Sequence, residues 1–471
     1  MRCPNGSRKK KGICVCKRGW TMIKGVCVPD VEQPAKRCPV NSKRIKGRCV
    51  CKNTYDMIRG FCVPKSRTSV KASTRFLKPL GRSLDGPLSQ SLEKPKSVNK
   101  TNHAKIIQSR FRKSKQSLRS NYLKRHCPGS SECLILGQKR KEILQFFNGF
   151  KNLDYSDKTL TPIGVNSING CVHELKFKHR DYISYAVLKT SKTPGSENLI
   201  YEYFMGLFIN KVNEYLPSFL ETYGVYNCSP EFHDKLISKE PLKFNKEIVP
   251  LIATNTELIK IGCANPLYNQ ILIQHVKNAE TLFSKIKDTD FLKNDLKHVL
   301  FQVYAALYCL RGNFTHFDLH ANNILLQKPF PTGVMEFHYD DIVFNSPYLV
   351  KIIDYGRSES SITPDVMHEV CKLDECKPDC GKHVGFSSSN LVDETTDVKL
   401  LHKLRDNLPK RLLDHIPEEL LTVFNSKNLS ECYEMFYDYL KDNHTKDNLT
   451  KINGILRIDT QFKKPFEFIK N

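Results

Sequence analysis

Two short stretches of the sequence place oxygen-bearing side chains beside apolar runs. In THFDLHANNILL (315–326), Asp318 stands five residues before Asn323, at the start of an aliphatic run. In YLVKIIDYGRS (348–358), Asp354 follows a second apolar run. Carboxylate and amide oxygens suit a hard cation such as Mg²⁺. Taken alone, Asp318 reads as a turn aspartate that caps its own loop, so its interpretation depends on residues elsewhere.

A glycine-containing turn and a lysine precede these stretches. Residues 164–192 read as two strands joined by a polar, basic turn, with Gly164 and Gly170 before the first strand and Lys189 ending the second. Such a turn lets backbone N–H groups approach polyphosphate oxygens, and the lysine adds a point charge. Either half alone is weak evidence, because a lysine at a strand end is commonly solvated.

A carboxylate in an apolar helix supplies a partner for that lysine. The pattern SENLIYEYFMGLFINKV predicts a helix from about Ser196, with Glu202 well inside it. An unpaired buried carboxylate is costly, so Glu202 requires a cation, and Lys189 is the obvious candidate. The alternative is that Glu202 faces solvent between its aromatic neighbours.

Further elements must hold these residues in place. The pattern predicts a buried strand at 271–276, a long apolar helix over 295–313, and a long loop between the two aspartate motifs. In 395–404, Asp397 stands at the start of a helix, where it could act as N-cap. The remainder, to Asn471, reads as helices that close an α-rich lobe.

In this order, the motifs of 150–400 resemble the protein-kinase-like set. The phrases NGCVHEL, YEYFMG, THFDLH and KIIDYGRS look more closely like kinase-like proteins of large nucleocytoplasmic DNA viruses. The resemblance implies an α+β, bilobal fold, with a small β-rich lobe on a larger α-helical lobe and ATP in the cleft.

The resemblance also implies a role for each motif residue. Asp318 would orient the acceptor hydroxyl and take its proton, while Asn323 and Asp354 would bind Mg²⁺. Lys189, paired with Glu202, would hold the α- and β-phosphates. Asp397 would hold the backbone of the catalytic loop. The ATP-binding residues would thus be Gly164, Gly170, Lys189, Glu202 and Asp354, and the catalytic residues Asp318, Lys189 and Asn323.

Several positions depart from the usual protein-kinase pattern. Phe317 replaces the arginine that meets a phosphorylated activation segment, which argues against activation-loop phosphorylation as the switch. His320 replaces lysine, as in small-molecule phosphotransferases. Val165 and Ser167 replace two glycines, and Tyr355 replaces phenylalanine. We therefore expect an ATP- and Mg-dependent Ser/Thr protein kinase of an atypical branch. The alternatives are an aminoglycoside-kinase-like phosphotransferase and an inactive, kinase-shaped virion scaffold.

The first 64 residues form a separate cysteine-rich region. Cys3, Cys14, Cys16 and Cys27 recur 35 residues later as Cys38, Cys49, Cys51 and Cys62, and an inner echo gives four hairpin-like loops. Disulfides, zinc and reduced thiols all remain open for these eight cysteines. The module resembles cysteine adaptor repeats on enzymes of large DNA viruses.

Residues 65–125 read as a basic, largely disordered linker before a domain at 126–471. The net charge of +25 is concentrated upstream: residues 1–125 carry 33 Lys and Arg against 5 Asp and Glu. Such an arm suits a virion protein or a nucleic acid. Residues 102–116 form an IQ-like helical pattern, for which a basic docking helix is the alternative to a calmodulin-like partner. No apolar run is long enough to span a membrane, and we expect a virion and host-cytoplasm protein.

A second cysteine cluster follows the DYGR motif. Cys371, Cys376 and Cys380, with His368 or His383, could form a structural Zn²⁺ site that braces the activation region. The spacings permit zinc without requiring it, and free thiols or a disulfide are the alternatives.

Overall fold

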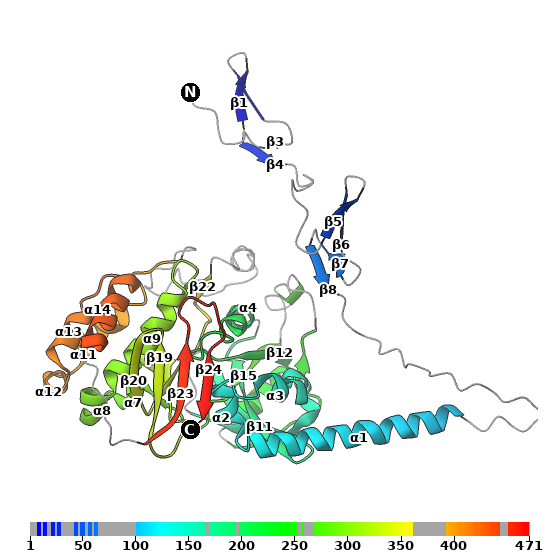
Figure 1. The fold of residues 1–471 in the computed structure, drawn as a ribbon. Helices are drawn as coiled ribbons and strands as arrows, with labels where there is room; N and C mark the ends of the chain where they lie inside the picture. The colour runs from blue at the N-terminus through cyan, green and yellow to red at the C-terminus, as the bar shows by residue number, and fades with distance from the viewer. Residues whose placement is uncertain are drawn as a thin grey trace, which may run out of the picture. The chain divides into compact units, whose positions relative to one another are not determined.

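The computed structural model divides the chain into two compact units, Met1–Lys96 and Ser97–Asn471. The structure describes four hairpins within residues 7–64, and residues 100–470 apart from 165–169, 195–196, 239, 253–256, 259–266, 361–391 and 443–450. The two units are described separately (Figure 1).

The first unit contains four antiparallel hairpins, each strand four residues long. They are β1 (Ser7–Lys10) with β2 (Ile13–Cys16), β3 (Trp20–Ile23) with β4 (Val26–Pro29), β5 (Ser42–Ile45) with β6 (Arg48–Cys51), and β7 (Tyr55–Ile58) with β8 (Phe61–Pro64). The last four strands begin 35 residues after the first four, so the sequence repeat is also a structural repeat. How the cysteine side chains are bonded lies outside the described residues.

The second unit has two lobes, and the smaller one is built on an antiparallel sheet of seven strands. Its order is β13-β9-β10-β11-β15-β12-β14. The bounds are β9 Ser156–Pro162, β10 Gly170–His179, β11 Tyr182–Ser191, β12 Thr222–Cys228, β13 Leu242–Lys243, β14 Val249–Pro250 and β15 Tyr268–Gln274. The predicted hairpin is β10 and β11, joined by a turn at Arg180 and Asp181.

Helix α4 (Glu197–Val212) packs between this sheet and the larger lobe. One set of its side chains, including Phe204, joins Val225 and Ile271 of the sheet. Another set, including Met205 and Ile209, belongs to the core of the larger lobe. This two-sided burial explains why the helix is apolar almost all round. Upstream lie α1 (Lys100–His126), α2 (Ser130–Ile135) and α3 (Arg140–Phe146), and α5 (Pro230–Leu236) follows β12.

The larger lobe is organised around α9 (Leu296–Cys309), most of whose side chains are buried. Its other helices are α7 (Leu282–Lys285), α8 (Thr289–Asn294), α11 (Lys399–Asn407), α12 (Lys410–Leu413), α13 (Glu418–Val423) and α14 (Leu429–Asp442). In Figure 1, α9, α11, α13 and α14 gather on one side of the unit and the strands β11, β12 and β15 on the other. The α+β architecture in two lobes agrees with the expectation from sequence.

Two expectations about this lobe were wrong. The segment between the aspartate motifs is a hairpin rather than a loop, formed by β19 (Val334–Tyr339) and β20 (Ile342–Ser346). The chain also ends in strands rather than helices: β23 (Ile452–Ile458) pairs in parallel with β19, and β24 (Glu467–Lys470) pairs with β23. Alternate residues of β19, β20 and β23 are buried, so both segments place side chains on one face of the same four-stranded sheet. The pairing of β23 with β19 joins segments far apart in the sequence, which local patterning did not reveal.

Three short pairings bring the sequence motifs together. Strand β18 (Ile324–Gln327) pairs with β21 (Leu349–Ile352) and with β16 (Glu280–Thr281). Strand β17 (Phe314–Thr315) pairs with β22 (Glu359–Ser360). The segment that carries Asp318 is therefore fixed at both ends against the segment that carries Asp354.

Candidate phosphotransfer site

Lys189 forms an ion pair with two carboxylates from distant parts of the chain. Its Nζ lies 2.7 Å from Glu202 Oε2 and 2.9 Å from Asp354 Oδ1. Lys189 comes from β11, Glu202 from α4, and Asp354 follows β21. The Glu202 side chain is 4% exposed and that of Asp354 35% exposed, so Asp354 is the more accessible of the two carboxylates.

Burial and charge act in opposite directions on this trio. Burial disfavours the charge on Lys189, but Asp354 and Glu202 outweigh it and raise the pKa of the lysine. Burial likewise opposes ionisation of Asp354, and the Lys189 ammonium overcomes it and holds the pKa of Asp354 below its usual range. For Glu202 burial prevails, helped by repulsion from Asp354, and its pKa rises to about 7. Lys189 therefore stabilises chiefly the charge on Asp354, and Glu202 is the member that takes up a proton first.

Asp318 and Asn323 lie on one tight loop between β17 and β18. The Asn323 side-chain nitrogen donates to the backbone carbonyl of Asp318 at 3.0 Å. The backbone N–H of Ile353 donates to the Asn323 carbonyl at 3.0 Å. Asn323 is thus fixed beside the residue that precedes Asp354, and the two predicted metal-binding residues lie at the same end of the paired strands β18 and β21.

Asp397 fixes the backbone of this loop by hydrogen bonds. Its carboxylate accepts hydrogen bonds from the backbone N–H of His316 at 2.8 Å and of Phe317 at 3.1 Å. Asp397 is buried, which raises its pKa. Its expected role in holding the catalytic loop agrees with this geometry. The N-cap interpretation was wrong: α11 begins at Lys399 without a side-chain cap, because the carboxylate is engaged by the loop.

Three residues for which sequence reasoning predicted no role also shape the site. The ring nitrogen Nε2 of His316 lies 2.9 Å from the Ile353 carbonyl, which links the two motif segments. The Tyr355 hydroxyl donates to the Ile352 carbonyl at 2.8 Å. Arg357 Nη1 lies 4.0 Å from Asp318 Oδ1, so a cation from the DYGR motif approaches the carboxylate whose neighbouring arginine is replaced by Phe317. The only sequence signal for these roles was proximity to the motif aspartates.

The oxygen donors near Asp354 fit a magnesium ion. The Asn323 amide nitrogen donates to the Asp318 carbonyl, and the amide oxygen is the kind of ligand that a hard cation prefers. Asp354 adds a carboxylate that stays ionised. Within the described residues, no group of three or more His, Cys, Asp and Glu side chains is arranged to hold a metal. Magnesium sites of phosphotransferases rarely need such a group, since substrate phosphates and water complete the coordination.

The two glycines have different structural positions. Gly164 has φ of +71°, a conformation that favours glycine, and it begins the turn between β9 and β10. Gly170 begins β10, where an added Cβ would lie 2.0 Å from the Thr190 carbonyl oxygen. Close contact between strands is therefore sufficient reason for glycine at 170. The tip of the turn, 165–169, and the proposed zinc ligands Cys371, Cys376, Cys380 and His383 lie outside the described residues.

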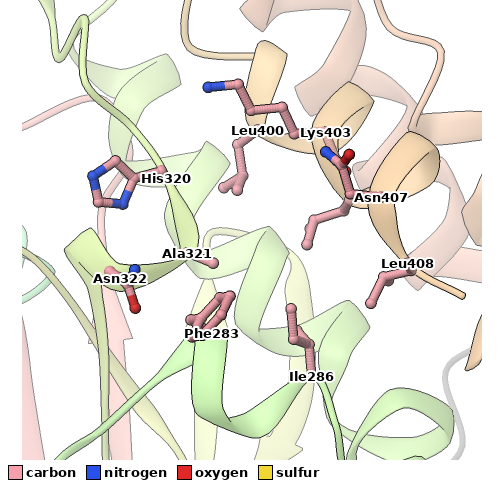
Figure 2. A pocket seen from close by; sticks show the side chains of 10 residues that line it. Phe283, Ile286, His320, Ala321, Asn322, Leu400, Lys403, Asn407 and Leu408 are labelled. Carbon is pink, nitrogen blue, oxygen red and sulfur yellow. The ribbon is translucent and has the colours of Figure 1, made fainter.

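A pocket of about 420 Å³ opens beside the Asp318 loop (Figure 2). Its walls come from α7, from the Asp318 loop and from α11. His320 belongs to the wall and also approaches Asp318, with Nε2 3.9 Å from Oδ1. Most of the lining is apolar, and it contains no Asp or Glu. The lining residues are Phe283, Ile286, His320, Ala321, Asn322, Leu400, Lys403, Leu404, Asn407 and Leu408.

Comparison with known proteins adds little to this geometry. Neither a model of a protein family nor a curated protein matches the chain. Among solved structures, "WaaP in complex with acyl carrier protein" aligns over 64% of this chain and 94% of its own, at 10% identity and a TM-score of 0.29. A likeness of that strength carries no conclusion about activity. The arrangement of Lys189, Glu202, Asp354 and Asp318 therefore remains the ground for assigning a function.

Proposed function

We propose that residues 126–471 form an ATP- and Mg-dependent phosphotransferase, and that its acceptor is a Ser or Thr hydroxyl of a protein. One observation carries the proposal: Lys189 bridges Glu202 and Asp354, at 2.7 and 2.9 Å, beside a loop that presents Asp318 and Asn323. This set supplies a cation for phosphates, two oxygen donors for Mg²⁺ and a carboxylate for the acceptor.

Each residue contributes a separate step toward transfer. Lys189 and a magnesium ion would neutralise charge on the nucleotide phosphates, which is the main electrostatic requirement of the reaction. Asp318 would orient the acceptor hydroxyl and take its proton. Asp397 and His316 keep the loop rigid, so that Asp318 holds its position without rearrangement.

A catalytically inactive scaffold is less well supported than an enzyme. The scaffold reading depends on the replaced glycines of the turn at 164–170. Lys189, Glu202, Asp354, Asp318 and Asn323 are all present, and the ionic contacts of Lys189 are formed. A chain without selection for nucleotide chemistry would have no need of a buried lysine between two carboxylates, which costs desolvation energy.

The pocket beside Asp318 bears on the choice of acceptor. Apolar side chains from α7 and α11 line it, which suits an apolar residue of a protein segment next to the acceptor hydroxyl. Aminoglycosides are polycationic and would find no acidic partner in this lining. His320, whose presence favoured a small-molecule acceptor, contributes to this same wall. The pocket therefore favours a protein acceptor over an aminoglycoside.

The decisive experiment measures transfer of labelled phosphate from ATP with Mg²⁺ by the full chain, with mixed proteins and aminoglycosides as acceptors. Asp318→Ala and Asp354→Ala are compared with Asp406→Ala, an exposed aspartate of α11. We expect labelled protein, at least a 100-fold loss in the first two variants, and no loss in the third. Labelling of aminoglycosides alone would establish the small-molecule alternative. Absence of transfer, together with no rise in melting temperature on adding Mg-ATP, would leave the scaffold.

We further propose a viral setting, based on the resemblance of the motif phrases to kinase-like proteins of large DNA viruses. The protein would be present in the virion and host cytoplasm, with its basic arm on a virion protein or nucleic acid. Helix α1 supports an anionic partner, since it contains nine Lys and Arg and no Asp or Glu. A calmodulin-like partner is the less favoured reading of the same helix. No described helix is long and apolar enough to cross a membrane.

A further inference from the structure

We propose that residues 127–150, here called the upstream segment, position α4 and Glu202 for phosphotransfer, and that Arg140 is the positioning residue through which they act. The inference rests on the proposed function, since it concerns the same site. It assigns a task to a part of the chain that precedes every kinase-like motif.

The connection between α4 and β12, residues 213–221, is fastened to the strand that leads into Asp354. The Lys351 side-chain nitrogen donates to the Phe219 carbonyl at 3.2 Å and to the Pro217 carbonyl. The Ile352 N–H donates to the Ser218 carbonyl at 2.7 Å. A shift of this connection would therefore displace both α4 and the segment that carries Asp354.

The last residue of the connection, Glu221, is fastened to the end of β15. The Gln274 N–H donates to the Glu221 carbonyl at 2.7 Å, and the Glu221 N–H donates to Gln274 Oε1 at 3.3 Å. Strand β15 leads directly from the sheet into the larger lobe. Glu221 therefore lies at the junction of the two lobes, at the end of the connection that follows α4.

Arg140 neutralises Glu221 from the upstream segment. Its Nε donates to Glu221 Oε1, and the Glu221 side chain is only 5% exposed. A carboxylate so deeply buried is stable only with a cation or several hydrogen bonds. The charges of both Glu221 and Arg140 also influence the pKa of Lys351. Arg140 thus joins the first turn of α3 to Glu221, the last residue of the connection.

The upstream segment and α4 also contribute side chains to the same apolar core. Ile135 and Leu136 are buried in one cluster with Tyr201, Met205 and Ile209 of α4. Tyr201 immediately precedes Glu202, so the core that the segment shares with α4 includes the neighbour of the carboxylate that binds Lys189. The upstream segment therefore supports both the helix and the connection that follows it.

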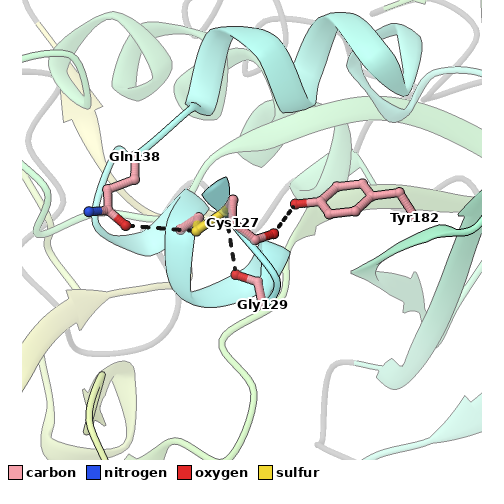
Figure 3. The surroundings of a disulfide bond; sticks show 5 residues. Cys127, Gly129, Gln138 and Tyr182 are labelled. Atoms are coloured by element: carbon pink, nitrogen blue, oxygen red, sulfur yellow. Dashed lines mark hydrogen bonds between the residues drawn. A yellow bond between two sulfur atoms is a disulfide. The ribbon is translucent and has the colours of Figure 1, made fainter. Parts of the chain in front are cut away.

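The segment also contacts the strand that carries Lys189. The Tyr182 hydroxyl, at the start of β11, donates to the Cys127 carbonyl at 2.9 Å (Figure 3). Cys127 and Cys133 are joined by a disulfide, which closes the turn between α1 and α2. Lys189 is thus borne on a strand that is hydrogen-bonded to the upstream segment, and Glu202 on a helix that shares an apolar core with that segment.

A built-in restraint on α4 suits a chain with Phe317 in its catalytic loop. In the protein kinases it resembles, an arginine at that position would couple the loop to a phosphorylated segment. Here the ion pair of Arg140 with Glu221 fixes the connection that follows α4, with no need for a phosphate group. The basic helix α1 runs directly into the segment, so a partner bound to α1 would act on this restraint first.

The test compares Arg140→Gln with Lys141→Gln in the full chain. Lys141 is the next residue of α3 and pairs with Glu214 at 3.1 Å, but its side chain is 80% exposed, so its loss should matter little. We measure kcat and the KM for ATP well below the melting temperature, together with hydrogen exchange of α4 and α9. We expect Arg140→Gln to lower kcat about 10- to 100-fold and to speed exchange in α4 but not in α9.

A second variant guards against simple misfolding. Arg140→Gln/Glu221→Gln removes both charges, so no carboxylate is left unpaired, and its kcat should lie between wild type and the single variant. Unchanged α4 exchange in folded Arg140→Gln, or faster exchange with kcat within twofold of Lys141→Gln, would overturn the positioning role. If the wild type transfers no phosphate, the proposed function fails, while the exchange of α4 still decides whether Arg140 holds that helix.

Discussion

The carboxylate of Asp397 accepts a hydrogen bond from the backbone N–H of Phe317, 80 residues earlier in the chain, at 3.1 Å. Phe317 is held with φ of +59°, a conformation that costs energy for a residue with a side chain. A second bond, from the His316 N–H, reaches the other carboxylate oxygen. The loop that presents Asp318 is therefore strained, and Asp397 keeps it in that conformation.

Replacing Asp397 by Asn should relax the loop. An amide offers one acceptor oxygen, and its NH₂ group would face a backbone N–H, so one of the two bonds is lost. We expect a stability loss of about 1–3 kcal/mol and a fall in kcat of about 10- to 100-fold, with little change in the rise of melting temperature caused by Mg-ATP. Denaturant unfolding and steady-state kinetics measure both. Asp406→Asn, on the exposed face of α11, is the control, and an equal effect there would contradict this role.

Lys189 and Glu202 should contribute unequally to stability. Lys189→Met leaves two carboxylates, Glu202 and Asp354, without their cation, which should cost about 3–5 kcal/mol. Glu202→Gln keeps the Lys189–Asp354 pair and replaces a carboxyl whose pKa is already about 7, so a loss of about 1 kcal/mol is expected. Urea unfolding at pH 7 compares them. Equal losses would show that Lys189 does not contact Asp354 in solution.

Lys351 should make stability depend on pH. Burial lowers its pKa from 10.5 to about 7, so below pH 7 the lysine is charged in both the folded and unfolded protein and the folded state carries the full cost. Between pH 7 and 10.5 the unfolded chain binds the proton and the folded protein does not. Stability relative to Lys351→Met should therefore rise with pH, by roughly 1 kcal/mol per unit. Denaturant unfolding from pH 6 to 9.5 measures the difference, and a flat difference would refute the depressed pKa.

Gly170→Ala should reduce stability rather than nucleotide binding. The new methyl group would lie 2.0 Å from the Thr190 carbonyl oxygen, so β10 and β11 must separate there, at a cost of about 1–3 kcal/mol. Melting temperatures without nucleotide and with saturating Mg-ATP distinguish the two effects. A wild-type melting temperature without nucleotide, combined with a weakened response to Mg-ATP, would restore the role in phosphate binding.

The sequence by itself was sufficient to predict the main residues of the candidate site and the order in which they occur. Five residues could be singled out because each stands at the end of an apolar element or inside one, where a polar group is costly without a partner or a function. They are Lys189, Glu202, Asp318, Asn323 and Asp354. The four hairpins of the first unit were equally accessible, since a 35-residue repeat is a local property of the chain.

Only the tertiary structure decided which of these residues contact one another. Lys189 was predicted to pair with Glu202, but its second partner, Asp354, is 165 residues away and comes near only because the two lobes pack together. The two-bond role of Asp397, the terminal strands and the contact of Arg140 with Glu221 depend likewise on packing between distant segments. Periodicity reports which side of an element is buried, whereas the identity of the element that buries it is set by the fold as a whole.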